Sequence, residues 1–368
     1  MPTPLPESEL AEAVAAAFDL CAGTPGAVVG VQAAAGTWFG TYGNADPDSP
    51  ITAQTHLRIG SVTKTFTATM LLQFVEQGLV SLDDPVSMHL PNTTDITVRL
   101  LATMRSGIAD YTADPGLVQS IIADPTAVHT CDEVIAVGLA LPRAFAPDAQ
   151  FAYSNTNYAI LGKVLEQVSG QDYATLLDER IGKPLGLANT SWPGESGHLP
   201  TPFARGYTLV FPGATAEHPV DTTDFNPCWA SAAGALVSTG QDLLTYATAL
   251  GTGELLSPQI HAMRVASLAD ASALGAGVEY GIGWMSISGW IGHSGHIPGY
   301  RAACYYHPEA QVAVVVLTAG DIVAGQCPPG FGGASIATES PCMAATARIF
   351  DVVTEVLGHP SNTPTGMG

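Results

Sequence analysis

The run at residues 62–75 is the feature that most constrains this chain, because it leaves a helix almost no polar face. A helix that is apolar nearly all round is buried, and Gly78 supplies an expected C-terminal stop. Its apolar side chains are Phe66, Met70, Leu71, Leu72, Phe74 and Val75. We therefore predict a buried central helix against which the other elements pack.

Ser61 and Lys64 stand at the start of this helix. Positions three apart share a helix face, with Cβ atoms about 5–6 Å apart, so the hydroxyl and the amine can meet. Burial disfavours the lysine cation, and a neutral amine beside a hydroxyl can activate a serine nucleophile. A lysine is also seldom buried without a partner. The alternative is that Ser61 only caps the helix, and the pair taken alone leaves both interpretations open.

The rest of the chain reads as strands, then helices, then strands. A first helix at residues 7–22 precedes β-type runs at 27–32 and 36–43. Helices at 132–141 and 157–168 dominate the middle, and the second is expected to end at Gly170. A helix at 241–250 then precedes strands at 282–287, 289–293, 300–307 and 311–318, and a helix at 343–357 closes the folded part.

This order predicts an α/β fold of the α+β type, with an antiparallel sheet built from both chain ends and flanked by N- and C-terminal helices. Residues 1–60 and 225–357 would form the sheet domain, and residues 61–224 a mainly helical domain. Residues 358–368, rich in Pro, Gly, Thr and Ser, would be a disordered tail. The central helix would lie at the seam, a usual place for an active site.

Composition excludes several partners. The net charge of −21 argues against nucleic acid, whose phosphates require basic patches, and against anionic membrane surfaces. There is no apolar run of about 18 residues, so we predict no membrane-spanning helix. The N-terminus lacks the basic-then-apolar pattern of a signal peptide, which leaves a cytoplasmic protein or one whose signal has been removed.

The six cysteines contain no Cys-x-x-Cys pair, which argues against a zinc site or a thioredoxin-like centre. Cys327 and Cys342 bracket a Pro/Gly-rich loop that has little else to hold it. We expect a disulfide between them, with buried free thiols as the alternative.

Tyr153 and Asn155 flank one residue and directly precede a helix, so both can project from one loop. A phenol near ammonium groups is pushed toward phenolate and can act as a base or proton shuttle. An asparagine amide can orient a lysine and bind a substrate amide. The alternative, with Asn155 as an N-cap and Tyr153 as a core residue, has equal weight on this loop alone.

His293, Ser294, Gly295 and His296 end a strand-like run. A glycine there lets the backbone approach a ligand closely, and side chains two apart share a face, so His293 and Gly295 would face the site. The backbone N–H of His296 would then be free to bind an oxyanion. Three positions apart on a strand, the two histidines point to opposite faces, so we predict no metal site.

Other catalytic signatures are missing. The chain has no Gly-x-Ser-x-Gly elbow, which disfavours an α/β-hydrolase. It also lacks His-Glu-x-x-His, a phosphate-binding Gly-Lys-Ser/Thr loop and a Gly-x-Gly-x-x-Gly fingerprint. The commonest zinc peptidase, nucleotide hydrolase and dinucleotide-binding functions are therefore excluded.

Ser61-x-x-Lys64, Tyr153-x-Asn155 and His293-x-Gly295, in this order and at these separations, resemble the penicillin-recognising serine hydrolases. This family comprises class C β-lactamases, serine D-Ala-D-Ala carboxypeptidases and related esterases and D-aminopeptidases. Within it the chain is most similar to the secreted Streptomyces-type D-Ala-D-Ala carboxypeptidases. The similarity covers about residues 8–357 and includes the stretches at 58–64, 105–108, 153–157, 229–234 and 238–243.

The resemblance implies a β-lactamase/DD-peptidase-like fold and the roles of the motif residues. Ser61 would attack a carbonyl and form an acyl-enzyme. Lys64 and Tyr153 would share the proton transfers, and which of them is the base stays open. Asn155 would hydrogen-bond Lys64 and the substrate amide, and His293 stands where many relatives have lysine.

The resemblance also implies substrate contacts. The backbone N–H groups of Ser61 and His296 would form the oxyanion hole, where loss of one donor costs about 3–4 kcal/mol. Trp229 would line the acyl pocket, and Tyr111 and Thr112 would contribute from the loop after residues 106–107. Gly295 would border the substrate, and no cofactor or metal is implied.

One departure from the family limits the substrate assignment. In the carboxypeptidases the leaving D-alanine is a carboxylate, bound with help from an arginine just before the His-x-Gly strand. Residues 280–287 contain no arginine here, and an unpaired buried carboxylate is costly. Either Ser294 or a protonated His293 or His296 replaces it, or the substrate has no carboxylate there.

We therefore expect a serine hydrolase, D-Ala-D-Ala carboxypeptidase-like and reactive with β-lactams. The alternatives are an esterase, amidase, D-aminopeptidase or class C-like β-lactamase on the same fold, or an idle binding domain with a β-lactam-reactive serine. From His293 we expect activity to fall as pH crosses about 6–7. The partner would be a small molecule or peptide, the chain a monomer, and the family and the disulfide favour an extracytoplasmic or secreted location.

Overall fold

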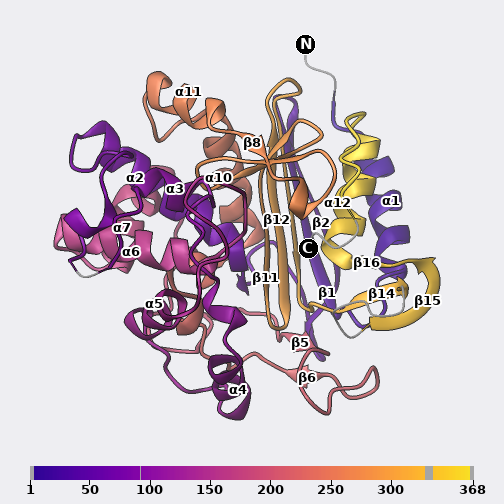
Figure 1. The fold of residues 1–368 in the computed structure, drawn as a ribbon. Helices are drawn as coiled ribbons and strands as arrows, with labels where there is room; N and C mark the ends of the chain where they lie inside the picture. The colour runs from indigo at the N-terminus through magenta and orange to yellow at the C-terminus, as the bar shows by residue number, and fades with distance from the viewer. Residues whose placement is uncertain (1–3, 92, 328–334, 365–368) are drawn as a thin grey trace.

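The computed structural model describes residues 4–91, 93–327 and 335–364 (Figure 1). Its centre is a nine-stranded antiparallel sheet in the order β3-β2-β1-β13-β12-β11-β10-β9-β8. In that order the strands are Ser49–Pro50, Gly36–Asp46, Gly26–Ala33, Val312–Thr318, Tyr300–His307, Trp290–Ile297, Met285–Ile287, Val278–Tyr280 and Ala269–Asp270. The predicted antiparallel sheet built from both chain ends is confirmed.

The two ends of the chain meet inside this sheet, where β1 pairs with β13 and Val29 lies opposite Val316. Both β12 and β13 are buried at every position. Strands covered on both faces lose the alternation of apolar and polar residues, and this explains why the sequence reads as continuous apolar runs here.

Helices cover both faces of the sheet (Figure 1). On one face α1 (Glu7–Asp19) packs against α12 (Ala345–Val356), and α12 packs on β12 and β13. On the other face α10 (Gly240–Thr252) packs on β1, β12 and β13. The predicted flanking helices are therefore present: α1 begins at the predicted residue and ends three residues early, and α12 begins two residues late and ends one residue early.

The remaining helices lie beyond α10, on the side of the sheet away from α1 and α12 (Figure 1). At their centre is α2 (Thr63–Glu76), which is buried at every residue from Thr63 to Leu72 and confirms the predicted buried helix. Around it lie α3 (Val98–Ala102), α4 (Pro115–Ala123), α5 (Cys131–Ala140), α6 (Asn155–Ser169), α7 (Tyr173–Leu177), the π-turn η4 (Asp178–Gly182), α8 (Lys183–Leu185), α9 (Ser231–Gly234) and α11 (Pro258–Ala266).

Short strands within the loops pair to form small sheets. They pair β4 (Leu57–Arg58) with β7 (Val237–Ser238), β5 (Tyr207–Thr208) with β6 (Val220–Asp221), and β14 (Val323–Gln326) with both β15 (Ser335–Pro341) and β16 (Met343–Ala344). The predicted Cys327–Cys342 disulfide is present and ties the end of β14 to the start of β16. The alternative of two free thiols at these positions is wrong.

The prediction of a disordered tail is wrong for residues 358–364. The main-chain carbonyls of His359 and Ser361 accept hydrogen bonds from Trp290 Nε1 at 2.8 Å and Ser288 Oγ at 2.6 Å. Ser361 is fully buried, and its backbone N–H bonds Thr354 of α12 at 3.1 Å. Composition alone suggested disorder, but these bonds hold the segment on the sheet. Residues 365–368 lie outside the described part.

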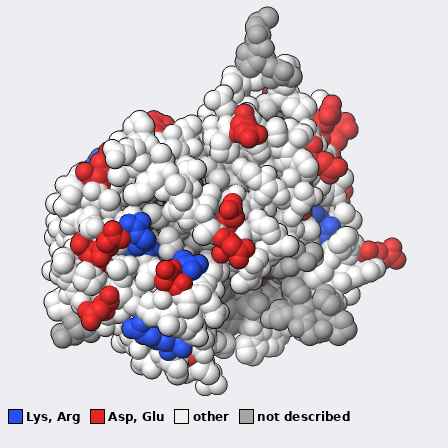
Figure 2. Space-filling model, turned by 45° about the horizontal axis from the view of Figure 1, so that its top comes forward, with Lys and Arg blue, Asp and Glu red and all other residues white. Residues whose placement is uncertain are grey.

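No helix in the described residues combines the length and the apolar character needed to cross a membrane. On the face drawn in Figure 2, acidic and basic side chains occur in small groups, several of them side by side, and most of the surface carries neither. How the chain divides into domains stays a prediction.

Candidate active site

Ser61 lies in a 3₁₀ turn, η1 (Gly60–Val62), that leads directly into α2. Its hydroxyl is 3.0 Å from Lys64 Nζ, so the two side chains meet as their spacing predicts. Neither η1 nor α2 is capped by a side chain. The alternative interpretation, in which Ser61 is an N-cap, is therefore wrong.

Lys64 is fully buried, and its Nζ has two further partners that only accept hydrogen bonds. These are Asn155 Oδ1 and the main-chain carbonyl of Ala233, each at 2.7 Å. A neutral amine has two hydrogens and one lone pair, so donation to these two oxygens leaves the lone pair for the Ser61 hydroxyl. Burial lowers the pKa of Lys64 to about 7, against the opposing effect of Asp110.

Asp110 is a site residue that the sequence analysis missed. Its Oδ2 accepts from the backbone N–H of Asn155 at 3.0 Å and from Asn155 Nδ2 at 2.8 Å. Because a carboxylate only accepts, these bonds fix the amide so that Oδ1 faces Lys64. Thr112 donates to Oδ1 of the same carboxylate through its N–H and its hydroxyl, both at 2.9 Å. No sequence signal indicated this role, because a carboxylate in a loop before a helix is usually interpreted as a helix cap. Asp110 does also cap the turn η3 (Tyr111–Ala113).

Asn155 is the first residue of α6, and Ser154 occupies the N-cap position. The alternative of Asn155 as an N-cap is therefore wrong. Its side chain instead links the Asp110 carboxylate to Lys64, which agrees with the predicted contact to the lysine.

Tyr153 lies over the lysine, with its ring centroid 4.7 Å from Lys64 Nζ. Its buried hydroxyl has no hydrogen-bond partner in the described residues, although the Ser61 hydroxyl is close enough to oppose part of the burial effect. Burial dominates and raises the pKa of Tyr153 well above its usual value. The expected shift toward phenolate is therefore wrong, because the cost of burying the phenolate anion is the largest influence on this pKa. Tyr153 is a neutral phenol that can donate a proton.

His293, in β11, is 1% exposed and held at both nitrogens. Nδ1 lies 2.5 Å from the Ser294 carbonyl and so carries the hydrogen. Nε2 then accepts from the Tyr280 hydroxyl at 3.2 Å. Burial and the charge of Lys64 lower the pKa of His293 to about 3, so the expected loss of activity through His293 titration near pH 6–7 is wrong. Tyr280 is the second site residue that the sequence analysis missed.

The end of β11 presses against the turn that carries Ser61. A Cβ on Gly295 would lie 1.9 Å from the carbonyl oxygen of Ile59 and 3.2 Å from the backbone nitrogen of Ser61. A Cβ on Gly60, whose φ is +50°, would lie 2.6 Å from the backbone nitrogen of His296. Only glycine at both positions allows this approach, which brings the two predicted oxyanion donors to one place.

The side chains of Ser294 and His296 lie apart from this centre. Ser294 lines a small cavity with Ala347 and Phe350 of α12, on the opposite face of the sheet from His293. His296 Nε2 lies 3.0 Å from Asp321 Oδ2. The suggestion that these side chains replace the missing arginine is not supported, because strand alternation turns them away from His293.

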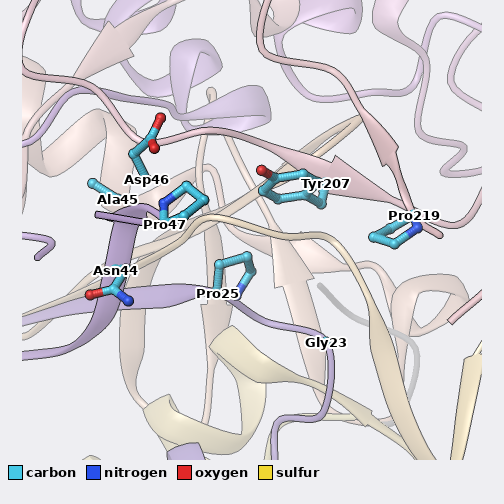
Figure 3. A pocket seen from close by; sticks show the side chains of 8 residues that line it. All are labelled: Gly23, Pro25, Asn44, Ala45, Asp46, Pro47, Tyr207 and Pro219. Atoms are coloured by element: carbon cyan, nitrogen blue, oxygen red, sulfur yellow. The ribbon is translucent and has the colours of Figure 1, made fainter. Parts of the chain in front are cut away.

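The other predicted substrate contacts differ in exposure. Tyr111 is fully buried, and its backbone N–H bonds Thr156 Oγ1 at 3.0 Å. Thr112 and Trp229 line one cavity of about 280 Å³. A second cavity, of about 320 Å³, is enclosed by Tyr207 and the rings of Pro25, Pro47 and Pro219 (Figure 3) and contains no predicted site residue.

Ser231 is strained beside the lysine, with φ 46° and ψ −152°. This conformation is essentially restricted to glycine. It starts α9, whose carbonyls at Ala232 and Ala233 accept from Thr67 and Lys64 of α2, each at 2.7 Å. The strained residue thus lies in a turn whose main-chain carbonyls accept hydrogen bonds from α2.

No three His, Cys, Asp or Glu side chains are grouped as metal ligands in the part of the chain that the structure describes. The groups available at the site are a serine hydroxyl, a lysine that is partly deprotonated near pH 7, two phenols and a neutral imidazole.

Comparison with known proteins agrees with this arrangement. A family model described as Beta-lactamase matches residues 12–325. The D-alanyl-D-alanine-carboxypeptidase/endopeptidase AmpH of Escherichia coli K12 is 31% identical over 164 residues, which is 42% of each chain. Two of the curated relatives that the chain matches are thus spanned over only 39% and 42% of their length.

Two solved structures are similar over most of their length. A D-stereospecific amidohydrolase from Streptomyces sp. has a TM-score of 0.77 and 32% identity, over 86% of this chain and 94% of that one. The D-amino acid amidase from Ochrobactrum anthropi SV3 in complex with L-phenylalanine amide has a TM-score of 0.78 and 26% identity, over 95% and 98%.

Proposed function

Because this chain belongs to the Beta-lactamase family of serine hydrolases, we propose that it hydrolyses amides or esters whose leaving group is uncharged. The observation that carries this proposal is the neutral His293–Tyr280 pair, which offers no positive charge to a departing carboxylate. D-Amino acid amides are the proposed substrates.

The acyl-enzyme would form at Ser61. Lys64 Nζ removes the hydroxyl proton through the lone pair that its other two bonds leave free, and Ser61 Oγ attacks the substrate carbonyl. The charge that develops on the carbonyl oxygen is stabilised by the backbone N–H groups of Ser61 and His296, which the glycine contacts bring together. A pKa near 7 suits Lys64 to this task, since a general base works best near the ambient pH.

Expulsion of the leaving group needs a proton. Tyr153 is a neutral phenol next to both Ser61 and Lys64, so it can donate to the departing nitrogen and recover the proton from the lysinium. Water then attacks the ester with Lys64 again as base, which releases the acid and restores Ser61. This assigns the base role to Lys64 and the donor role to Tyr153.

The side chains that would face the leaving group carry no positive charge, and this favours an uncharged leaving group. His293 stays uncharged across the working pH range, and its side-chain partner among the described residues is the Tyr280 phenol. Arg264 is 1% exposed and donates to the Ile282 carbonyl and to Thr69 Oγ1, both at 3.0 Å. An arginine used in this way cannot pair with a bound carboxylate, and an unpaired carboxylate would be costly to bury.

The two solved relatives support the choice of D-amino acid amides, since one is named a D-stereospecific amidohydrolase and the other a D-amino acid amidase. The E. coli relative supports D-Ala-D-Ala carboxypeptidase activity as the second candidate.

Two peptides that differ only in the charge of the leaving group test the proposal. D-Ala-D-Ala and D-Ala-D-Ala-NH₂ share an acyl part, and the second releases D-alanine amide in place of the D-alanine carboxylate. We expect kcat/KM to be at least about tenfold higher for the amide, given the cost of an unpaired charge. D-Alanine amide should also be cleaved, and Ser61→Ala should cleave none of the three.

The reverse preference would establish the carboxypeptidase. Hydrolysis that persists in Ser61→Ala would overturn the nucleophile. A chromogenic cephalosporin added to the same preparation distinguishes an idle binding domain, which would form one stable adduct and show no turnover.

A further inference from the structure

The cavity drawn in Figure 3 lies outside the candidate active site and has a volume of about 320 Å³. This volume is within the usual range of small-molecule sites, about 300–1,000 Å³. Two segments far apart in the sequence form its walls. Residues 23, 25 and 44–47 come from the chain before β1 and from the end of β2, and Tyr207 and Pro219 come from the β5–β6 hairpin.

Backbone hydrogen bonds hold the two walls in place. The carbonyl of Pro25 accepts from the N–H of Asn44 at 2.8 Å, which ties the two parts of the first wall together. The carbonyl of Ala45 accepts from the N–H of Arg205 at 2.8 Å, two residues before Tyr207, which ties the first wall to the second. A cavity held in this way is formed before a ligand arrives, which lowers the cost of binding.

The charged side chains beside the cavity carry an excess of one negative charge. Arg205 lies between two carboxylates, and its Nε donates to Asp221 Oδ2 at 3.0 Å. Its Nη1 is 3.8 Å from Asp46 Oδ2, which is too far for a hydrogen bond. Asp46 is the carboxylate that lines the cavity, and its side chain is 45% exposed. Because Arg205 is paired closely with Asp221, the charge of Asp46 is left to attract a further cation.

The rest of the lining is aromatic or apolar (Figure 3). Tyr207 contributes an aromatic ring, which attracts a cation placed over its face. The rings of Pro25, Pro47 and Pro219 add apolar surface that favours an apolar group. Among the described residues, the lining contains no lysine or arginine, so an anion would meet the Asp46 carboxylate without compensation.

We infer that this cavity binds an organic ammonium ion. The charged end of the ligand lies near the Asp46 carboxylate, and its apolar body lies against Tyr207 and the proline rings. The site is separate from Ser61 and its partners, none of which lines the cavity. The inference therefore goes beyond the proposed function and does not depend on it.

Three ligands of similar shape and different charge test the inference. Phenethylammonium, 2-phenylethanol and phenylacetate each carry a phenyl ring on a short chain, and their end groups are positive, neutral and negative at pH 7. None of them is an amide or an ester, so titration calorimetry can use the wild-type protein. We expect the ammonium ion to bind at least about threefold more tightly than the alcohol, as exposed ion pairs and cation–π contacts allow. Phenylacetate should bind most weakly.

Asp46→Asn and its matched control Asp48→Asn locate the charge that causes this preference. Each substitution removes one negative charge, but Asp48 is exposed in the turn after β2 and does not line the cavity. Asp46→Asn should bind the ammonium ion and the alcohol about equally, with an unchanged affinity for the alcohol that shows an intact cavity. Asp48→Asn should keep the wild-type preference. In the wild type, added salt should weaken the binding of the ammonium ion and leave that of the alcohol unchanged.

Loss of the preference in Asp46→Asn alone supports the inference. Equal affinities of the wild type for the three ligands, tighter binding of phenylacetate or no binding of any ligand would overturn it. Equal behaviour of the two aspartate variants would also overturn it, because the preference would then come from the net charge of the protein. None of these outcomes affects the proposed function, which is tested by the cleavage of amides at Ser61.

Discussion

At the scale of single residues, Lys64 is the group on which the chemistry depends. It is fully buried, yet its partners are a hydroxyl, an amide oxygen and a main-chain carbonyl. None of these is a charge, so burial dominates and brings its pKa to about 7. The influence in the other direction is the negative charge of Asp110, which raises the pKa of Lys64.

The pH dependence of kcat/KM should reflect the titration of Lys64 and not that of His293. A base must be deprotonated, so kcat/KM should fall about tenfold per pH unit below pH 7 and level off above it. His293, with a pKa of about 3, is neutral throughout this range. His293→Gln should therefore keep the same acid limb at a lower plateau. A limb that disappears in His293→Gln would contradict the assignment.

Asp110 should act as a positioning residue. Asp110→Asn keeps the shape but loses an acceptor for Asn155, and loss of a charged hydrogen bond costs about 1.5–3 kcal/mol, or about 10- to 100-fold in kcat. Because the Asp110 carboxylate raises the pKa of Lys64, the acid limb should also move to lower pH. A merely structural role would lower activity without moving the limb.

Asp114→Asn is the control for that substitution. Asp114 is four residues away and caps α4 through one backbone bond, and asparagine caps a helix as well as aspartate does. Its kcat should stay within about threefold of wild type, given the similar capping strengths. A comparable loss in both variants would speak against a specific role for Asp110.

At the scale of elements, the contact between β11 and η1 positions the two backbone N–H groups that we propose as the oxyanion site. The contact is made by backbone on both sides, with glycine at positions 60 and 295. A larger residue at either position would keep the two elements apart. At position 295, for example, its Cβ would lie 1.9 Å from the Ile59 carbonyl oxygen, which is far closer than the two atoms can come. The pairing of β11 with β12 holds His293, Gly295 and His296 in one register.

Gly295→Ala should therefore damage the site more than the stability. The methyl group meets the Ile59 carbonyl, and a displacement of about 1 Å at the site can cost about 100-fold in rate. The free energy of unfolding should fall by about 1–3 kcal/mol, as for other overpacked sites. Initial rates and urea titration measure the two effects separately.

Gly182→Ala provides the comparison. Its Cβ would lie 3.4 Å from Asp178 Oδ1, an ordinary contact, in the π-turn after α7. It should leave kcat/KM unchanged. If Gly295→Ala were equally harmless, the close approach of β11 to the Ser61 turn would have no catalytic meaning.

At the scale of the whole molecule, the site lies where the antiparallel sheet meets the helices from the middle of the chain (Figure 1). Strands from the two ends of the chain pair within that sheet. The disulfide between Cys327 and Cys342 stabilises a small three-stranded sheet beside α1 and α12, on the other side of the large sheet from α2 (Figure 1). A disulfide fits the proposed extracytoplasmic location.

Removal of this disulfide should affect stability alone. The two cysteines are 15 residues apart, and a loop of that length contributes about 3 kcal/mol to the free energy of unfolding. The double variant Cys327→Ser, Cys342→Ser should lose about 2–4 kcal/mol and keep its kcat/KM. The reduced wild type should match it, and a parallel loss of activity would mean that the small sheet supports the site.

The sequence by itself determined the elements and the reacting pair. A run without a polar face can only be a buried helix, and a lysine three residues after a serine on that helix must share its face. The order of strands, then helices, then strands predicted the antiparallel sheet, and the resemblance of the three ordered motifs predicted the family. The helix and the reacting pair follow from periodicity and spacing, which act along the chain, whereas the family follows from a resemblance.

Only the tertiary structure decided the charges and the faces. Asp110 is 45 residues from Asn155, and Tyr280 is 13 from His293, so no local pattern relates them. The neutrality of His293 and Tyr153 results from burial by distant elements, and the placement of Ser294 toward α12 results from strand alternation in the folded sheet. The order of residues 358–364 depends on bonds to Ser288 and Trp290. Desolvation and long-range hydrogen bonds exist only after packing, which is why composition and spacing could not predict them.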